Sequence, residues 1–100
     1  MFDLTRVAGF DWDAGNSRKS AEKHAVTQAE AEQVFFCLKL LVLADVRHSL
    51  GEERYHALGI TDDGRHLHIT FTLRGSGRFV RVISARDMHR KERSIYAQEA

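Results

Sequence analysis

The sequence predicts an α+β fold with the element order β-α-α-β-β-β-α, in which a three-stranded antiparallel meander packs on two N-terminal helices and a C-terminal helix. Three observations support it. Over residues 66–73, apolar side chains alternate with histidine and threonine, the period of a strand with one face on a core. A turn containing Gly75 and Gly77 follows, and then a β-branched run over residues 79–84. Two helix-start signals lie upstream of this hairpin.

The N-terminal quarter is predicted to contain a short strand and a polar helix. Residues 4–10 have the composition of a strand. Asp13 can cap a helix that begins at Ala14 and ends before Ala25. One face of this helix is polar, and we weigh contact with a partner or a phosphate against simple solvation, which the spacing alone favours. That face consists of Asn16, Lys19, Lys23 and His24.

The second helix is predicted to be the main core-facing helix. Thr27 caps it, and Glu30 is the capping-box partner. Residues 40–43 fit either a continuation of the helix or a short extended segment, because the apolar run is too short for its period to decide. The apolar residues that recur at helical spacing are Ala31, Val34, Phe35, Leu38, Leu41 and Val42.

The C-terminal half begins with a predicted loop over residues 44–51, a strand over residues 54–60 and a turn over residues 61–64. After the hairpin, Ser84 is predicted to cap the last helix, with Asp87 as its acidic partner. This helix is basic. His66 and His68 are expected on the solvent face of their strand.

Length and composition predict one domain over residues 1–100 with a modest core, since 43% of the residues are hydrophobic. No apolar run is long enough to cross a membrane, and the acidic N-terminal segment is unlike a secretory signal. The lone Cys37 excludes an internal disulfide and is expected to be a buried small hydrophobe rather than a nucleophile. We therefore expect a cytoplasmic protein with no membrane contact.

The charge is unevenly distributed, although the net charge is only +1. Residues 1–64 carry 7 basic and 11 acidic groups, whereas residues 65–100 carry 8 basic and 3 acidic groups. This asymmetry favours an anionic partner for the C-terminal part, with nucleic acid first. The alternative is that the basic residues at 90–93 only solvate one face of a helix.

Short segments spaced through most of the chain carry a resemblance to a known family. They are FDWD at 10–13, Asn16 with KHAV at 23–26, EAE at 30–32 with Phe35, His48-Ser49, Glu53-Arg54-Tyr55, Leu58-Gly59, Asp63-Gly64-Arg65, Phe71-Thr72 with Arg74, and RVISAR at 81–86 with Arg93 and Tyr96. In this order and spacing they resemble the BrnT family of ribonuclease toxins, which belong to bacterial type II toxin–antitoxin pairs.

The resemblance implies a compact RelE-like fold, metal-independent cleavage of RNA, and a cognate ribbon-helix-helix antitoxin, BrnA, which neutralises the toxin. It also implies that the toxin–antitoxin complex binds its own operator DNA. Two positions depart from the family pattern. Ala25 stands where the family usually has glycine, which affects the end of the first helix. Residues 37–39 replace a helix-breaking turn, which leaves the path of residues 37–44 open.

RNA can be cleaved without a metal ion because its own 2′-OH is a nucleophile. The protein must remove that proton, neutralise charge on the phosphate and protonate the leaving 5′-oxygen. Arginine suits the second task because its planar fork binds phosphate oxygens. The arginine candidates are Arg65, Arg74, Arg81 and Arg86, and the acid–base candidates are His48 and Glu53. The candidate substrate-binding residues are Lys19, Lys23, Arg90 and Tyr96.

Each assignment has a structural alternative. Glu53 could simply pair with an arginine, and Tyr96 lies on the apolar side of the last helix. No cofactor is expected, and a metal site is disfavoured because His66-x-His68 supplies only two ligands. The sequence favours a ribonuclease toxin over a non-catalytic RNA- or protein-binding module of the same fold. The identities of the general base and general acid stay open, as does the oligomeric state, a homodimer included.

Overall fold

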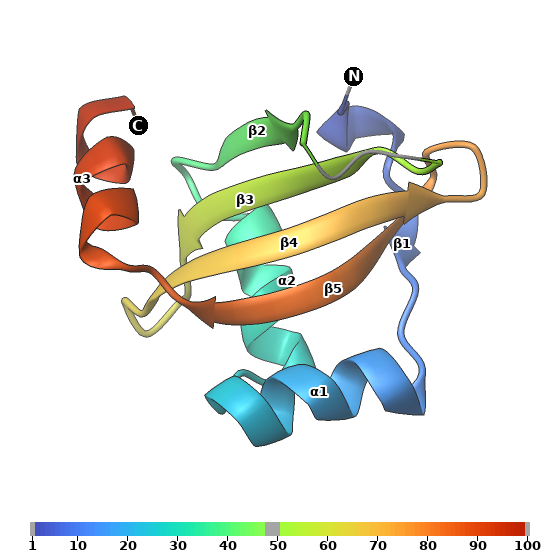
Figure 1. Ribbon diagram of the computed structural model, residues 1–100, viewed down its shortest axis with the longest axis horizontal. Helices are drawn as coiled ribbons and strands as arrows, with labels where there is room; N and C mark the ends of the chain where they lie inside the picture. The colour runs from blue at the N-terminus through green and yellow to red at the C-terminus, as the bar shows by residue number, and fades with distance from the viewer. Residues whose placement is uncertain (1, 48–50, 100) are drawn as a thin grey trace.

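The computed structural model describes residues 2–47 and 51–99 (Figure 1). After a 3₁₀ helix at Leu4–Arg6, its elements are β1 (Gly9–Phe10), α1 (Ala14–His24), α2 (Gln28–Phe35), β2 (Leu41–Asp45), β3 (Arg54–Ile60), β4 (His66–Arg74), β5 (Phe79–Asp87) and α3 (Arg90–Glu99). The predicted α+β class is confirmed, and so is the meander of β3, β4 and β5.

The strands form one sheet in the order β1-β5-β4-β3-β2. The pairs β2–β3, β3–β4 and β4–β5 are antiparallel, and β1 pairs parallel with the start of β5 through Gly9 and Phe10. The sheet is therefore mixed, with the short β1 at one edge and β2 at the other (Figure 1).

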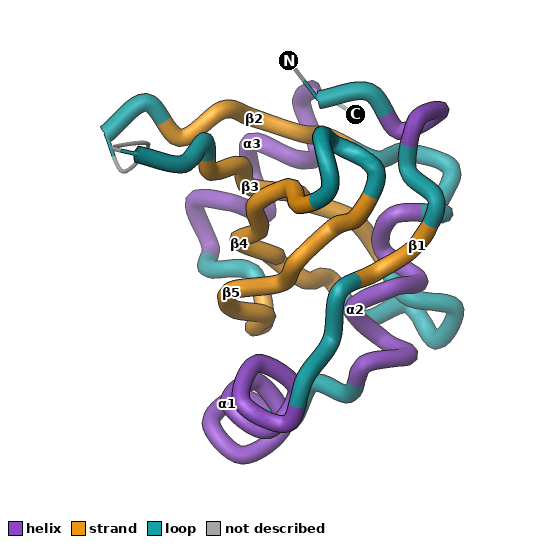
Figure 2. Tube along the Cα trace, turned by 90° about the vertical axis from the view of Figure 1, so that its right-hand side faces the viewer, coloured by secondary structure: helices purple, strands orange, loops and turns teal. Residues whose placement is uncertain are grey.

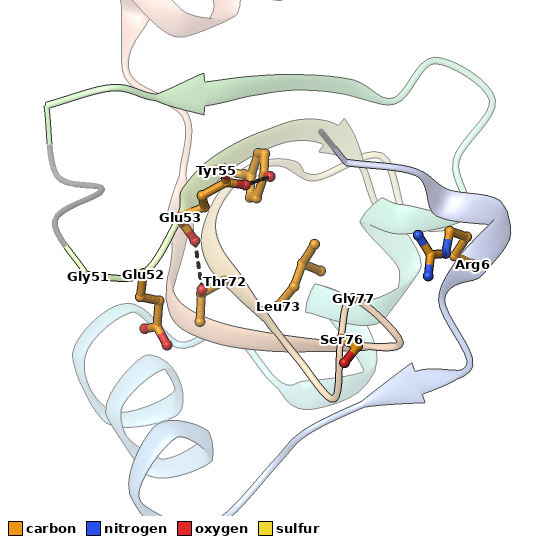
Figure 3. A pocket seen from close by; sticks show the side chains of 9 residues that line it. All are labelled: Arg6, Gly51, Glu52, Glu53, Tyr55, Thr72, Leu73, Ser76 and Gly77. Atoms are coloured by element: carbon orange, nitrogen blue, oxygen red, sulfur yellow. Dashed lines mark hydrogen bonds between the residues drawn. The ribbon is translucent and has the colours of Figure 1, made fainter.

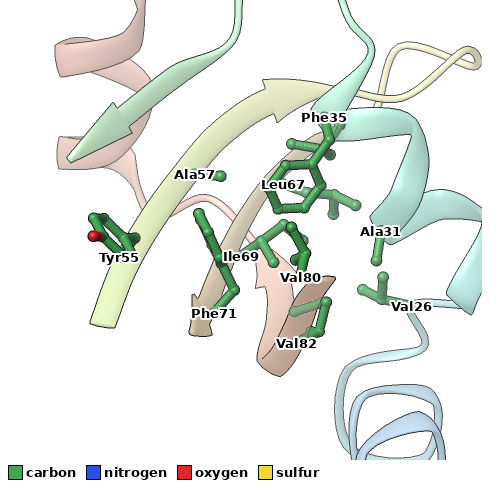
Figure 4. Close-up of a cluster of buried hydrophobic side chains, with 12 residues drawn as sticks. Val26, Ala31, Phe35, Tyr55, Ala57, Leu67, Ile69, Phe71, Val80 and Val82 are labelled. Atoms are coloured by element: carbon green, nitrogen blue, oxygen red, sulfur yellow. The ribbon is translucent and has the colours of Figure 1, made fainter. Parts of the chain in front are cut away.

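Helix α2 covers one face of the sheet and lies behind β3 and β4 in Figure 1. Its buried Ala31, Val34 and Phe35 pack on side chains that point to the same face of the meander. Figure 4 shows this core, whose strand residues are Tyr55, Ala57, Leu67, Ile69, Phe71, Val80, Val82 and Ala85. The side chains of Phe35 and Phe71 meet edge to face, with ring centroids 5.0 Å apart.

Helix α1 runs beside β5, as both views show (Figures 1 and 2). Its two buried residues are polar, Asn16 and Ser20. The Asn16 amide donates to the carbonyl oxygens of Asp11 and Val82, and the Ala85 amide donates to Ser20 Oγ. The expected polar, solvated face is therefore wrong for Asn16, which satisfies backbone groups of β5 instead.

The predicted helix starts at Asp13 and Thr27 are confirmed, and both residues form reciprocal capping boxes. Ala25, which stands where a glycine was expected, takes a left-handed conformation with φ 53° and ends α1. Non-glycine residues occupy this region at a cost.

The predicted strand over residues 4–10 is mostly wrong. Asp3 accepts a hydrogen bond from the Thr5 amide and starts a 3₁₀ turn, which leaves only Gly9 and Phe10 to pair with β5. A local side-chain to backbone bond thus competes with strand pairing over the first half of the segment.

Helix α2 ends at Phe35, and residues 41–45 form β2, so the extended alternative is the correct one. The predicted core position Leu38 is wrong, because it is 98% exposed in the turn between these elements. The predicted loop over residues 44–51 also starts too early, since Ala44 and Asp45 pair with β3.

The predicted helix start at Ser84 is wrong. Strand β5 continues to Asp87, because residues 84–87 pair with residues 67–70 of β4. The helix begins at Arg90, and its first-turn acid is Glu92, which accepts from the His89 amide. Helix α3 packs on Leu58 of β3 through Tyr96, at one end of the sheet face opposite α2.

Candidate functional site

The sheet face opposite α2, which we call the open face, gathers most polar side chains of the strands. Cross-strand partners in an antiparallel sheet point to the same face. The register therefore places three rows on it, namely Arg54–Thr72–Arg81, His56–Thr70–Ser84 and Leu58–His68–Arg86. Guanidinium, imidazole and hydroxyl groups from three strands thus share one surface, of which α3 covers only one end (Figure 1).

A cavity of about 400 Å³ opens between this face and α3, and we call it the histidine cavity. The rings of His56 and His68 lie in it with centroids 4.8 Å apart. His68 was expected on the solvent face, but only 8% of it is exposed, so that prediction is wrong. The remaining lining residues are Leu43, Leu58, Thr70, Arg86, Glu92 and Ile95.

Arg86 and Glu92 form a bidentate ion pair at the α3 side of the histidine cavity. Arg86 Nη1 and Nη2 donate to the two carboxylate oxygens of Glu92 at 2.8 Å each. Although burial opposes it, the bonds from Arg86 and from the His89 amide lower the pKa of Glu92 to about 2. The site therefore holds a fixed carboxylate and a fixed cation side by side.

Glu53 lies in a second pocket of about 400 Å³, near the other end of the sheet (Figure 3). Its carboxylate accepts a hydrogen bond from the Tyr55 hydroxyl, and this bond raises the pKa of Tyr55 to about 12. Its carbonyl oxygen accepts from Thr72 Oγ1 at 2.7 Å. Arg74, beside this pocket, is paired with Glu52. The predicted acid–base residue His48 lies outside the described residues.

Arg81 lies where the open face meets the start of α1. Its guanidinium contacts the carboxylates of Asp13 at 2.7 Å and Asp11 at 3.4 Å. The hydrogen bond to Asp13 raises the pKa of Arg81 further above its usual range. Two carboxylates thus hold this arginine in place.

A sequence model of the family described as "Ribonuclease toxin, BrnT, of type II toxin-antitoxin system" matches residues 12–92. The chain belongs to the BrnT family. The family consists of ribonuclease toxins, so RNA is the target and an antitoxin the partner of its members.

The BrnT assignment agrees with a likeness in three dimensions. The crystal structure of the Brucella abortus ribonuclease toxin BrnT is 20% identical to this chain, with a TM-score of 0.61 over 82% of this chain and 97% of that one. The two proteins therefore share a fold. No curated protein sequence matches the chain.

In this BrnT-family chain, Arg65 ties the two N-terminal helices to β5. Its guanidinium donates to the carbonyls of His24 and Ala25 at the end of α1, and to the carboxylates of Glu30 and Asp87. Because these bonds join α1, α2 and β5 on the core side of the sheet, away from the open face, the geometry gives Arg65 a structural role.

The predicted substrate-binding residues of this BrnT-family chain do not converge. Lys19 and Lys23 are exposed on α1, and Arg90 is exposed at the start of α3. The Tyr96 side chain of α3 is buried against Leu58 of β3, and its hydroxyl donates to the Lys39 carbonyl oxygen at 2.6 Å. Its predicted apolar environment is thereby confirmed, and burial is the main cause that raises its pKa.

Sequence reasoning missed His56 and misplaced His68. The only signal would have been the register that brings β3 and β4 together, since the two residues are diagonal neighbours across that pair. Among the residues that the structure describes, no three His, Cys, Asp or Glu side chains are grouped to hold a metal ion. Within the same residues, no helix has the length and apolar character of a membrane span.

Proposed function

We propose that this BrnT-family chain is a metal-independent endoribonuclease that arrests translation in the cytoplasm by cleaving RNA on the open face. One observation carries the proposal: Arg81 and Arg86 project from β5, on either side of Ser84, onto a face that also holds two imidazoles. Guanidinium groups supply the phosphate contact that a divalent metal would otherwise provide.

The chemistry follows from the substrate. The 2′-OH of RNA attacks the adjacent phosphorus, so the protein needs proton-transfer groups and cations rather than a metal-bound water. Arg74 extends the cationic surface toward the pocket of Glu53. The assignment of Glu53 and His48 as acid–base residues stays a prediction, and Glu53→Gln tests it directly.

The deciding experiment is cleavage of total RNA by the purified protein in EDTA. We expect cleavage to persist and the fragments to end in 2′,3′-cyclic phosphate, the product of attack by the 2′-OH. Loss of activity in EDTA with recovery in Mg²⁺ would contradict metal independence. Binding of RNA without cleavage would instead favour a non-catalytic module of the same fold.

We further propose that the antitoxin is a ribbon-helix-helix protein of the BrnA type and that the complex binds operator DNA. Membership of the BrnT family supports an antitoxin partner, and the resemblance set out above supports its type. We expect a small reading frame next to the gene to encode such a protein, and we expect that protein to copurify with the toxin. We expect size exclusion with light scattering to show whether the toxin enters that complex as one copy or as a homodimer.

A further inference from the structure

Among the described residues, two imidazoles, a guanidinium and a carboxylate of the open face converge at the histidine cavity. The residues come from four elements: His56 from β3, His68 from β4, Arg86 from β5 and Glu92 from α3. None of the sequence signals assigned a role to the two histidines. Their proximity is produced by strand register alone, and the cavity leaves room for a small group between them and α3.

His56 is held by both of its ring nitrogens. Nε2 lies 2.9 Å from the carboxylate of Asp45 on β2, and Nδ1 lies 3.1 Å from Thr70 Oγ1 on β4. The carboxylate accepts the N–H of Nε2 and fixes the ring, so proton transfer takes place at Nδ1, whose partner is a hydroxyl that can rotate to donate or to accept. The side chain is 29% exposed and thus reachable from the cavity.

His68 has the opposite environment. It is nearly buried beneath α3, and its Nε2 lies 3.6 Å from the Glu92 carboxylate, which Arg86 already binds. Burial lowers the pKa of His68 to about 4, against the opposing influence of Glu92. At neutral pH this imidazole is uncharged and can accept a proton. The groups that face it are Glu92 on α3, Arg86 on β5 and His56 on β3.

We propose that His68 and His56, in place of His48 and Glu53, are the general base and the general acid of RNA cleavage, acting on a phosphodiester bound in the histidine cavity beside Arg86. This inference rests on the proposed ribonuclease function and names the residues that carry it out. Pairs of titratable groups whose environments differ in this way are the usual acid–base assignments in enzymes.

The His68 imidazole takes the proton of the 2′-OH, and the 2′-oxygen forms a bond to phosphorus. The bond between phosphorus and the 5′-oxygen breaks, and the 5′-oxygen takes a proton from the His56 imidazolium. The products are a 2′,3′-cyclic phosphate and a 5′-hydroxyl. Arg86 lies at the cavity wall, where its charge stabilises the phosphorane oxygens.

The test compares two RNA oligonucleotides that contain one mapped cleavage site. One has the natural linkage, and the other carries sulfur in place of the bridging 5′-oxygen, a leaving group that needs no general acid. His56→Gln and His56→Ala are expected to lose about 100-fold or more on the natural linkage, and most of that loss should disappear on the sulfur linkage. His68→Gln and His68→Asn should lose activity on both.

His66→Ala is the matched control. His66 lies on the same strand and the same face as His68, but its ring packs on Tyr96 and it does not line the cavity. Its activity should equal that of the wild type. Circular dichroism and affinity for an uncleavable 2′-deoxy oligonucleotide report the fold and substrate binding of each variant, and both should be retained. Two substitutions are made at position 68, Gln and Asn, so that the test can still be carried out if one of the variants does not fold.

Different results would refute the proposed ribonuclease function and the assignment of His56 and His68. Wild-type protein that leaves RNA intact would overturn the ribonuclease function and this assignment together. An active wild type, with folded His56 and His68 variants that remain as active, would overturn the assignment alone. Loss on both linkages for the His56 variants would remove His56 as the acid. Restored cleavage on the sulfur linkage, confined to the His56 variants, supports the pair.

Discussion

Arg65 holds Asp87 through two parallel hydrogen bonds, with Nε 2.7 Å from Oδ1 and Nη2 3.2 Å from Oδ2. The same guanidinium bonds to the end of α1 and to Glu30 in the first turn of α2. The hydrogen bond to Asp87 raises the pKa of Arg65, and that to Arg65 lowers the pKa of Asp87. One side chain therefore joins α1 and α2 to β5, which lies much later in the sequence.

We expect Arg65→Ala to lower the free energy of unfolding by about 1–3 kcal/mol, because it removes charge-assisted bonds and leaves two helix-end carbonyls without a donor. Urea denaturation measures the change. Arg18→Ala is the control, since Arg18 and Glu22 are an exposed pair whose side chains are 68% and 73% accessible, and such pairs contribute about 0–1 kcal/mol. Equal effects of the two substitutions would refute the role of Arg65.

Gly59 marks the close approach of β3 to the end of α2. A Cβ at this position would lie 2.8 Å from Cys37 Sγ, 2.9 Å from Val34 Cγ1 and 3.1 Å from the Val34 carbonyl oxygen. Gly59→Ala should cost about 1–3 kcal/mol of stability, because two packed side chains and the Val34 carbonyl group must shift to admit the methyl group. Gly9→Ala is the matched control in β1, since its Cβ would meet only a Phe79 ring at 3.7 Å. Thermal unfolding of both variants checks the contrast.

Stability should fall as the pH drops from about 6.5 to about 4. Burial lowers the pKa of His68 in the folded chain to about 4 from its usual 6.5, so in this window the unfolded chain binds a proton that the folded chain excludes. Above about pH 6.5 this effect is absent, and by about pH 4 it has lowered the free energy of unfolding by about 3 kcal/mol. Between about pH 4.5 and about pH 2, protonation of Glu92 lowers the free energy of unfolding further.

His68→Gln should flatten the slope of unfolding free energy over the upper window, measured by urea titrations at each pH. His66→Gln serves as the comparison and should leave the slope in place. A wild-type profile that is flat from pH 6.5 to 4 would mean that His68 titrates normally in the folded protein.

Arg81→Ala should weaken RNA binding and cleavage while the protein stays folded. If Arg81 contacts one phosphate, the slope of log affinity against log salt should decrease by about 0.7 for single-stranded RNA. Titrations of a labelled oligonucleotide at several salt concentrations measure the slope, and Arg18→Ala on α1 gives the reference. A native circular dichroism spectrum with unchanged activity would place Arg81 outside the RNA surface.

Antitoxin binding should depend on charge through its association rate. Arg90 and Arg93 are exposed on α3, so reversal of either charge should slow association with an acidic partner and change dissociation little. Added salt should act in the same direction. Surface plasmon resonance at two salt concentrations separates the two rates. An association rate indifferent to both changes would move the antitoxin contact to another surface, of which α1 with Lys19 and Lys23 is the next candidate.

Local signals predicted the fold well where local interactions decide it. Asp13 and Thr27 cap their helices because each capping box lies within four residues. Ser84 carries a similar signal, yet its backbone is paired with Thr70, and the ladder of β4 and β5 outweighs the cap. Leu38 has the spacing of a core-facing helix residue, but α2 ends at Phe35 and the chain turns there toward β2. Leu38 lies in that turn and is exposed.

The site was harder to predict than the fold. The arginines could be selected by their chemistry, but their partners could not: Arg65 binds helix ends, whereas Arg86 binds Glu92 beside a cavity. His56 and His68 are separated by a turn and a change of strand, so their contact depends on a register that periodicity within either strand does not contain.

The polar attachment of α1 to β5 also sets the order in which the chain can become a folded toxin during synthesis. Asn16 and Ser20 find their partners 66 and 65 residues later in the chain, and no apolar residue of α1 is buried. A nascent chain that stops before β5 lacks both of these partners, and Arg65 alone can bind the end of the helix. The ribosome therefore completes nearly the whole polypeptide before the open face exists, and truncated products of the gene should be harmless to the cell that makes them.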